Sequence, residues 1–251
     1  MIPVVFLQGI GGEARLWAPQ VASFKAAGYE PIALDLPGYG ARQPVDTMTF
    51  DMLAADVEAA VDARKLRWPV LIGHSLGGMI VQTCLRRRPD GYGAVVLSGT
   101  SPAFGNPDGD FQKKFVADRL GPLDAGRTMH DMATEIADAL IAPGANAKGR
   151  QLLIEVMGAI DPRTYRAAVR CLVGFDERAN LGHIKVPVLC IVGARDNNAP
   201  APMMQRMAAK IPGAKYVCLP GVGHMPNLEA PADYDAAILD FLREALARVA
   251  V

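Results

Sequence analysis

A serine between two glycines is the strongest chemical signal in the chain. The apolar residues 70–72 are typical of a short buried strand, the residues at 73–77 are Gly-His-Ser-Leu-Gly, and a helix-forming stretch begins at position 76. A Gly-x-Ser-x-Gly turn between a strand and a helix holds the serine hydroxyl clear of the sheet, where a base can reach its proton. The glycines leave room for the strained backbone that this requires. The pattern predicts that Ser75 is a nucleophile.

The general base should be a histidine, and the chain contains four. His224 lies in a glycine-containing loop directly after the apolar stretch 215–219, and loops at the carboxyl ends of parallel strands are where open α/β sheets carry their sites. His74 should point away from the neighbouring serine, so we interpret it as a packing or hydrogen-bonding residue. His130 and His183 are interpreted as surface or core residues. We therefore predict that His224 is the base.

An acid that orients the base should follow another strand, between the serine and the histidine in chain order. Asp196 lies just after the apolar stretch 188–192. The competing loop, after a strand that ends at Ser98, offers no carboxylate before Asp108. We predict that Asp196 orients His224, rather than only capping a helix.

Two backbone amides are needed to stabilise the negative charge of a tetrahedral intermediate. One should come from Leu76, directly after the nucleophile, and the other from the glycine-rich loop 8–12, where Ile10 stands between glycines. Those glycines could also serve only a tight turn. The residues expected to contact the substrate are Gly9, Gly11, Met225 and Phe104.

Short apolar runs alternate with longer amphipathic stretches, which is typical of a parallel sheet with helices on both faces. The expected strands are 3–7, 30–34, 70–72, 94–98, 188–192 and 215–219. The expected helices between and after them are 17–27, 50–65, 76–88, 202–211 and 231–249.

The alternation stops between residues 102 and 182, where no strand-like run occurs over a length too great for a plain loop. Four helical segments are expected there instead, at 110–120, 128–141, 148–160 and 163–175, separated by Gly-Pro, Pro-Gly and Asp-Pro breakers. The sequence thus predicts a core domain made of residues 1–101 and 183–251, with a helical cap, or lid, at 102–182.

Composition narrows the class of protein. Lysine plus arginine balance aspartate plus glutamate at 26 each, which gives no reason to expect a nucleic acid or an anionic membrane as partner. No apolar run approaches the roughly 20 residues of a membrane span, and the first residues lack the pattern of a signal peptide, so a cytoplasmic protein is expected. The cysteines, Cys84, Cys171, Cys190 and Cys218, are spaced unlike metal or disulfide motifs. No cofactor and no metal are expected.

These motifs resemble those of the α/β-hydrolase superfamily, in particular its small esterases, lactonases, enol-lactonases and carbon-carbon bond hydrolases. Besides the proposed triad, the resemblance includes Trp17, the Asp-Leu-Pro-Gly-Tyr-Gly sequence at 35–40, and the stretch 223–231, in which Glu229 is interpreted as a helix cap. The resemblance implies an α/β-hydrolase fold with an inserted helical cap over a serine nucleophile.

The chain departs from the family pattern in two places. Family members commonly have His-Gly at the oxyanion loop, where this chain has Gln8 and Gly9. They also usually begin with an antiparallel hairpin, whereas this sequence starts at the strand 3–7, which predicts six strands, all parallel. The strand 30–34 would then form an exposed edge that a partner chain could cover, so the protein is expected to be a monomer or a homodimer.

A serine rather than an aspartate nucleophile favours acyl transfer to water over dehalogenation or epoxide opening. The expected substrate is a small, largely apolar carboxylic ester or lactone, cleaved through an acyl-enzyme. One alternative is carbon-carbon cleavage of a vinylogous diketone acid, which would want an arginine in the pocket. Arg163, Arg166 and Arg170 fall on one side of a cap helix and could meet the substrate carboxylate, although we interpret them first as a solvated face. Another alternative is a non-catalytic ligand receptor on the same fold.

Overall fold

The computed structural model describes residues 1–106 and 108–247, and within them six strands form one sheet in the order β2-β1-β3-β4-β5-β6. All neighbouring strands are parallel. The strands are β1 (Pro3–Leu7), β2 (Glu30–Leu34), β3 (Val70–His74), β4 (Ala94–Ser98), β5 (Val188–Gly193) and β6 (Lys215–Leu219). This confirms the predicted six-stranded parallel sheet.

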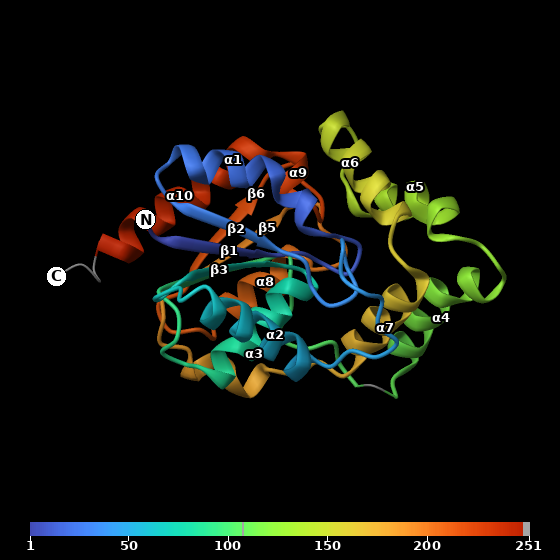
Figure 1. Cartoon of the computed structure of the whole chain (residues 1–251), viewed down its shortest axis with the longest axis horizontal. Coiled ribbons are helices and arrows are strands. Elements are labelled where there is room, and N and C mark those ends of the chain that lie inside the picture. Colours follow the sequence, from blue (N-terminus) through green and yellow to red (C-terminus); the bar gives the residue numbers. More distant parts are fainter. Residues whose placement is uncertain (107, 248–251) are drawn as a thin grey trace.

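Helices cover both faces of the sheet (Figure 1). One layer contains α1 (Ala18–Ala26) and α10 (Pro231–Ala247), and the other contains α2 (Phe50–Ala63), α3 (Leu76–Arg87) and α8 (Ala201–Ala208). The short helix α9 (Pro226–Glu229) precedes α10. The expected helix 231–249 is described only as far as residue 247, and its last two residues lie outside the described part of the chain.

The central strands are fully buried because each of their faces packs against a helix layer. In β1, Val4 and Phe6 pack with the α1 and α10 layer, whereas Val5 and Leu7 belong to the opposite cluster. The strand at the edge, β2, is only half-buried. A parallel sheet covered by helices on both sides requires strands that are apolar on both faces. The apolar sequences of these strands therefore predicted a parallel sheet.

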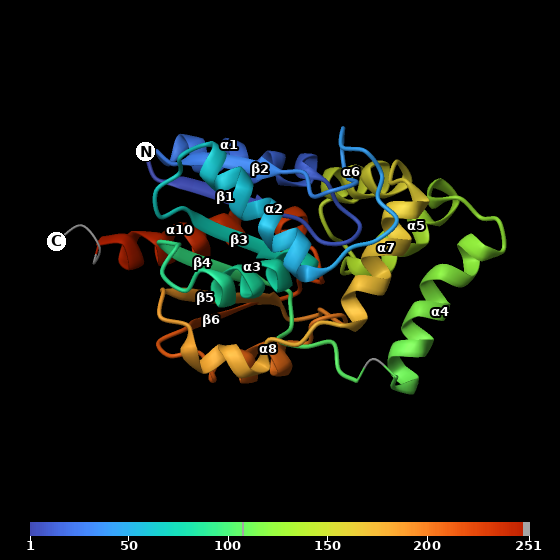
Figure 2. The same cartoon turned by 60° about the horizontal axis from the view of Figure 1, so that its bottom comes forward.

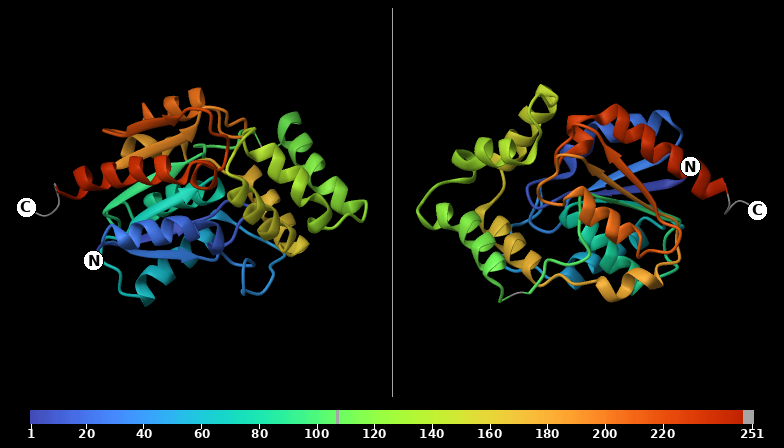
Figure 3. Two further views of the ribbon diagram at one scale, coloured as in Figure 1. Left: turned by 90° about the horizontal axis from the view of Figure 1, so that it is seen from above. Right: turned by 180° about the vertical axis from the view of Figure 1, so that it is seen from behind.

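Four α-helices, followed by the 3-10 helix Arg178–His183, lie between β4 and β5 in the described part of the chain. They are α4 (Asp110–Asp124), α5 (Met129–Leu140), α6 (Ala147–Gly158) and α7 (Pro162–Val173). Figures 2 and 3 show them together at the end of the sheet that faces away from both chain termini. An isolated antiparallel bridge between Ala103 and Asp176 closes the base of the segment.

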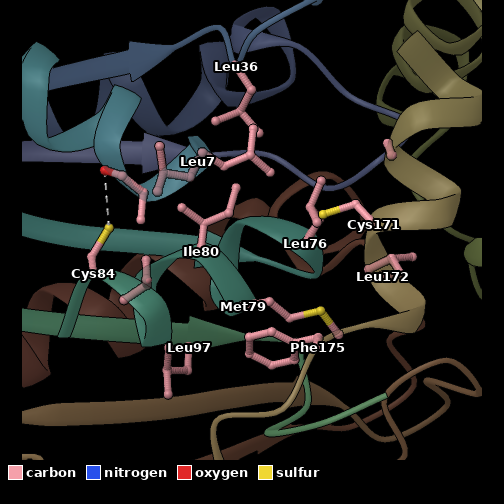
Figure 4. Packing of buried hydrophobic residues seen from close by; sticks show 14 of the residues in the cluster. Leu7, Leu36, Leu76, Met79, Ile80, Cys84, Leu97, Cys171, Leu172 and Phe175 are labelled. Atoms are coloured by element: carbon pink, nitrogen blue, oxygen red, sulfur yellow. Dashed lines mark hydrogen bonds between the residues drawn. The ribbon is translucent and has the colours of Figure 1, made fainter. Parts of the chain in front are cut away.

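These helices attach to the rest of the molecule in two different ways. Cys171, Leu172 and the following Phe175 share a hydrophobic cluster with α3, and Figure 4 shows them beside Leu76 and Met79. By contrast, α5 and α6 pack mainly on each other, and one face of α5 forms a separate cluster with α6, Leu16, Met225 and Leu228. Residues of α4, of the start of α5 and of α7 all belong to the main cluster, so most of this segment is continuous with the main core.

One predicted breaker is wrong. The Gly-Pro pair at 121–122 was expected to end a helix at residue 120, but α4 continues to Asp124 with Pro122 inside it. Pro122 removes one amide donor, yet the last turn still closes because the Ala125 amide donates to the Gly121 carbonyl at 2.9 Å. A proline near the end of a helix costs fewer bonds than one at its centre.

No helix in the described ranges is long and apolar enough to cross a membrane.

Gly193, at the end of β5, is where the loop that carries His224 approaches the sheet. A Cβ atom there would lie 2.1 Å from the Gly223 carbonyl oxygen and 2.3 Å from that of Val222. We expect Gly193→Ala to lower the free energy of unfolding by about 1–3 kcal/mol, because backbone must move to admit the methyl group. The matched control is Gly182→Ala, at an exposed position where an added Cβ meets nothing within 4 Å, and it should leave the free energy of unfolding unchanged or raise it by up to about 1 kcal/mol. Urea unfolding measures both, and equal effects would contradict the close approach.

Candidate active site

Ser75 occupies the turn between β3 and α3 in a backbone conformation that few residues other than glycine adopt, with φ of 53° and ψ of −116°. Hydrogen bonds hold the turn, because the Ser75 amide donates to the Ser98 carbonyl at 2.9 Å and the Thr100 hydroxyl donates to the Ser75 carbonyl at 2.8 Å. A Cβ at Gly77 would lie only 2.2 Å from the Leu7 carbonyl oxygen. The second glycine of the motif thus lets α3 start directly against β1.

His224 and Asp196 form a buried pair at the ends of β6 and β5. The His224 ring donates from Nδ1 to Asp196 Oδ2 at 2.8 Å, and Asp196 Oδ1 accepts the amides of Asn198 and Ala199, each at 2.8 Å. Burial alone would raise the pKa of Asp196, but the hydrogen bond and charge of His224 and the two amides outweigh it and lower the pKa. The carboxylate stays ionised, and the other ring nitrogen, Nε2, is left available for a proton.

Ser75 and His224 line one cavity of about 530 Å³ between the sheet and the cap helices. Among the hydrogen bonds of the described residues there is none between the Ser75 hydroxyl and His224. Catalytic hydrogen bonds are often long in the absence of substrate, so a contact between the two side chains stays a prediction. The expected contact residues Gly9, Gly11, Phe104 and Met225 all line the cavity, as does Ile10.

The loop expected to supply oxyanion donors is fixed from outside the cavity. The Tyr39 hydroxyl donates to the Ile10 carbonyl at 2.9 Å. Gln8, where relatives commonly have histidine, joins the loop to the segment after β2. In the orientation that satisfies both partners, its amide nitrogen donates to the Leu34 carbonyl at 2.8 Å and its oxygen accepts the Leu36 amide at 3.3 Å. The amide of Leu76 is free of helical bonds because it belongs to the first turn of α3.

His74, beside the serine in the sequence, makes a specific hydrogen bond to the residue proposed as the base. Its ring lies 4.8 Å from that of His224, measured between centroids, and its Nε2 donates to the His224 backbone carbonyl at 2.7 Å. A carbonyl can only accept, so the proton sits on Nε2 of a neutral ring. Burial, together with the nearby His224, lowers the pKa of His74 to about 3. The hydrogen-bonding role suggested by the sequence thus has a specific partner.

Glu229 holds the histidine loop to the cap. Its carboxylate accepts the amides of Gly223, Met225 and Ala142, each at 2.8 Å. The His224 amide itself donates to the Leu140 carbonyl, at the end of α5, at 2.7 Å. The expected role of Glu229 as a helix cap is therefore too narrow, since it bonds amides on both sides of His224 and one amide of the cap.

The remaining charged candidates lie elsewhere. His130 and His183 are exposed, whereas Arg163 pairs with Asp161 and Arg166 with Asp124. None of the three cap arginines proposed from the sequence lines the cavity of Ser75. Instead the cavity is lined by residues that the sequence analysis did not single out, namely Lys114, Asp118, Arg119 and Tyr165. Only helical periodicity, around α4 for the first three and around α7 for Tyr165, could have indicated them. Within residues 1–106 and 108–247, no three His, Cys, Asp or Glu side chains are placed to hold a metal ion.

Comparison with known proteins places the chain in one family. The model of the alpha/beta hydrolase family matches residues 4–237, so the chain belongs to that family and is a hydrolase. It is similar to a putative carbamate hydrolase from a Caulobacter species, with 29% identity over 95% of this chain and 90% of the relative. It is also similar to the pimeloyl-acyl-carrier-protein methyl ester esterase of Chromobacterium violaceum, with 27% identity over 95% and 93% of the two chains. Among solved structures, the enol-lactonase from Burkholderia xenovorans has a TM-score of 0.85, 25% identity, and coverage of 97% of this chain and 92% of that one.

The buried neutral state of His74 should make the fold sensitive to acid. Its pKa is lower in the folded than in the unfolded protein, so stability is lost as the pH falls from about 6.5 towards 3, where only the unfolded chain takes up the proton. As the pH falls, the free energy of unfolding should decrease less steeply in His74→Gln than in the wild type, by about 1 kcal/mol per pH unit. The amide of the introduced Gln can still donate to the His224 carbonyl. Urea unfolding between pH 4 and 6.5 measures the slopes. His183→Gln, at an exposed site, is the control and should keep the wild-type slope, and an unchanged slope in His74→Gln would overturn the interpretation.

Removing the charge of Glu229 should loosen the histidine loop. We expect Glu229→Gln to lower the free energy of unfolding by about 2–3 kcal/mol. In the variant, an amide NH2 group would face backbone N–H donors that bond a carboxylate oxygen in the wild type. Glu155→Gln changes an exposed carboxylate of α6 in the same way and should alter stability by less than about 0.5 kcal/mol. Chemical unfolding at pH 7 compares them, and the idea fails if both variants match the wild type.

Proposed function

We propose that the protein is a serine hydrolase that cleaves a small, largely apolar carboxylic ester or lactone through an acyl-enzyme. The observation that carries this is the buried hydrogen bond between His224 and Asp196, on neighbouring strand ends, beside a serine held in a strained strand-to-helix turn of the same cavity. A base of fixed tautomer that shares a cavity with the serine hydroxyl is the arrangement needed to activate that hydroxyl.

In the proposed reaction, Ser75 Oγ attacks the ester carbonyl carbon while its proton passes to His224 Nε2. Asp196 keeps the ring oriented and stabilises the imidazolium that forms. The carbonyl oxygen becomes negative and accepts the amides of Leu76 and Ile10. Collapse of this intermediate breaks the bond to the leaving oxygen, which takes the proton from His224. Water then attacks the acyl-enzyme by the same steps, releasing the acid and restoring the serine.

The shape and lining of the cavity support a substrate of moderate size. Its volume of about 530 Å³ lies within the usual range for small-molecule sites. Most of its walls are apolar, and the cap side contributes Phe104, Phe111, Phe115, Ile136, Leu153 and Met157. One relative is named as a methyl ester esterase and another as an enol-lactonase. Their names therefore cover the two proposed substrate classes, esters and lactones. We further propose that residues 102–182 act as a lid over this cavity, as a unit distinct from a core of residues 1–101 and 183–251.

Replacement of the proposed triad residues tests this function. Ser75→Ala should lose ester turnover by several powers of ten, because no other group supplies the attacking oxygen, with triad removal typically costing on the order of a millionfold. Asp196→Asn should leave more activity, with a loss on the order of ten-thousandfold, because the base survives in the wrong tautomer. The double variant should be about as inactive as Ser75→Ala alone.

The measurement is kcat/KM on 4-nitrophenyl butyrate. Ser101→Ala is the matched control, since Ser101 lines the same cavity but its hydroxyl donates to the Ala103 carbonyl, and it should stay within about threefold of the wild type. A wild-type protein that neither turns over such esters nor reacts with a fluorophosphonate at Ser75 would rule out the proposed function. Retention of more than about a hundredth of the activity by Ser75→Ala would rule out the nucleophile.

A further inference from the structure

The charges on the cavity wall do not cancel. Besides His74 and His224, the charged or titratable side chains that line the cavity are Lys114, Asp118 and Arg119 of α4, together with the phenol of Tyr165. Lys114 and Asp118 neutralise each other, because the ammonium nitrogen lies 2.7 and 2.9 Å from the two carboxylate oxygens. The wall therefore carries one uncompensated positive charge, which belongs to Arg119.

Arg119 also differs from most other arginines of the cap. Five of those, Arg127, Arg150, Arg163, Arg166 and Arg178, each pair with a carboxylate of the cap itself, whereas Arg170 lines a different groove. Within the described residues Arg119 has no such partner, and its guanidinium carbon lies 4.0 Å from the centroid of the Phe115 ring, which also lines the cavity. Stacking on an aromatic ring fixes the plane of a guanidinium while its N–H donors stay free for another group.

Tyr165 of α7 lines the same cavity as Arg119 and supplies a second donor. The residue is almost wholly buried, at 1% exposure, and no hydrogen bond among the described residues involves its hydroxyl. Because Tyr165 lines the cavity, this hydroxyl can take a partner from a ligand there. Burial raises the pKa of Tyr165, and the positive charge of Arg119 partly opposes that rise.

We propose that Arg119 and Tyr165 bind a carboxylate of the substrate, separate from the carbonyl that Ser75 attacks, so that the preferred substrate is an ester or lactone that also carries a free acid group. This inference rests on the proposed function, and it narrows the substrate class. The guanidinium provides two parallel N–H donors for the two carboxylate oxygens, and the phenol provides a third donor.

A single net positive charge fits a carboxylate better than a phosphate ester. A phosphate monoester carries about −1.5 to −2 charges at neutral pH and presents three strong acceptor oxygens. Here the neighbouring ammonium is already paired with Asp118, and the other cavity walls are mostly apolar. A monoanion with an apolar body matches both the charge and the lining.

The experiment compares two substrates of similar size, the mono-4-nitrophenyl ester of glutaric acid and the uncharged 4-nitrophenyl valerate. Rates without enzyme are subtracted, because the carboxylate of the glutarate ester speeds its own spontaneous hydrolysis. The ratio of their kcat/KM values cancels any general damage to the catalytic groups or to the fold. We expect the wild type to prefer the acid ester, and Arg119→Gln to reduce that ratio by about 10- to 100-fold, the loss expected for a hydrogen-bonded charge pair. The ratio for Arg119→Lys should lie between the ratios for the wild type and Arg119→Gln. Tyr165→Phe should reduce the ratio by about 3- to 10-fold.

Arg170→Gln is the matched control, because Arg170 also lies in the cap but lines a different groove, and it should leave the ratio unchanged. A ratio that does not depend on Arg119 would overturn the carboxylate site while leaving the esterase function in place. A phosphate-bearing ester preferred over the glutarate ester would also overturn it.

A second measurement avoids any dependence on turnover. Binding of monomethyl glutarate and of methyl valerate to Ser75→Ala, by calorimetry, should favour the anion in that variant and lose the preference in the double variant Ser75→Ala, Arg119→Gln. Equal affinities for the two esters would count against the site. The proposed function fails on different grounds, namely absence of turnover and of labelling at Ser75.

Discussion

The hydrogen bond between His224 and Asp196 is the interaction on which the arrangement of the site depends. Placing an ionised carboxylate in a buried position is costly unless its oxygens are fully bonded. The fold meets this requirement at the end of β5, where two backbone amides bond one oxygen of Asp196 and leave the other for the ring. The pair can exist only where the loops after β5 and β6 meet, and Gly193 is the residue that lets them meet.

The same requirement extends to the backbone around His224. Its carbonyl accepts from His74, its amide donates to Leu140 of the cap, and Glu229 bonds the amides on either side of it. The amides of Gly223, His224 and Met225 and the carbonyl of His224 therefore all have partners, which fixes the ring without any need for a direct bond to the serine. Because one of these partners is the end of α5, a displacement of α5 from the core would break a bond to the proposed base. The end of α5 is thus tied to the loop of the proposed base, whereas α4 packs on α7.

The sequence predicted the sheet, the order of its helices and the proposed triad because each is encoded locally. A strand buried on both faces is apolar along its whole length, and Gly-x-Ser-x-Gly demands its strand and helix within a few residues. The continuation of α4 through Pro122 was missed because a breaker rule takes no account of its distance from the end of the helix. The wider role of Glu229 was missed for a different reason, since the Ala142 amide that it bonds is 87 residues away along the chain. The choice among the cap arginines likewise depends on which faces of α4 and α7 turn towards the cavity, and both helices carry arginines.

The position of Arg119 reconciles an apolar cavity with a charged ligand. A guanidinium fully inside such a cavity would lose its hydration and would need a permanent carboxylate partner of the protein, which would then block the site. Arg119 is only half-buried, and the Phe115 ring covers one face of its guanidinium, so part of its hydration is kept and part is replaced by the ring. Exclusion of water by an apolar substrate would then strengthen the attraction between the guanidinium and a carboxylate, because the effective dielectric constant falls. Binding of the apolar body and binding of the acid group would thus reinforce each other, which is a reason for a cation to remain unpaired in an otherwise apolar wall.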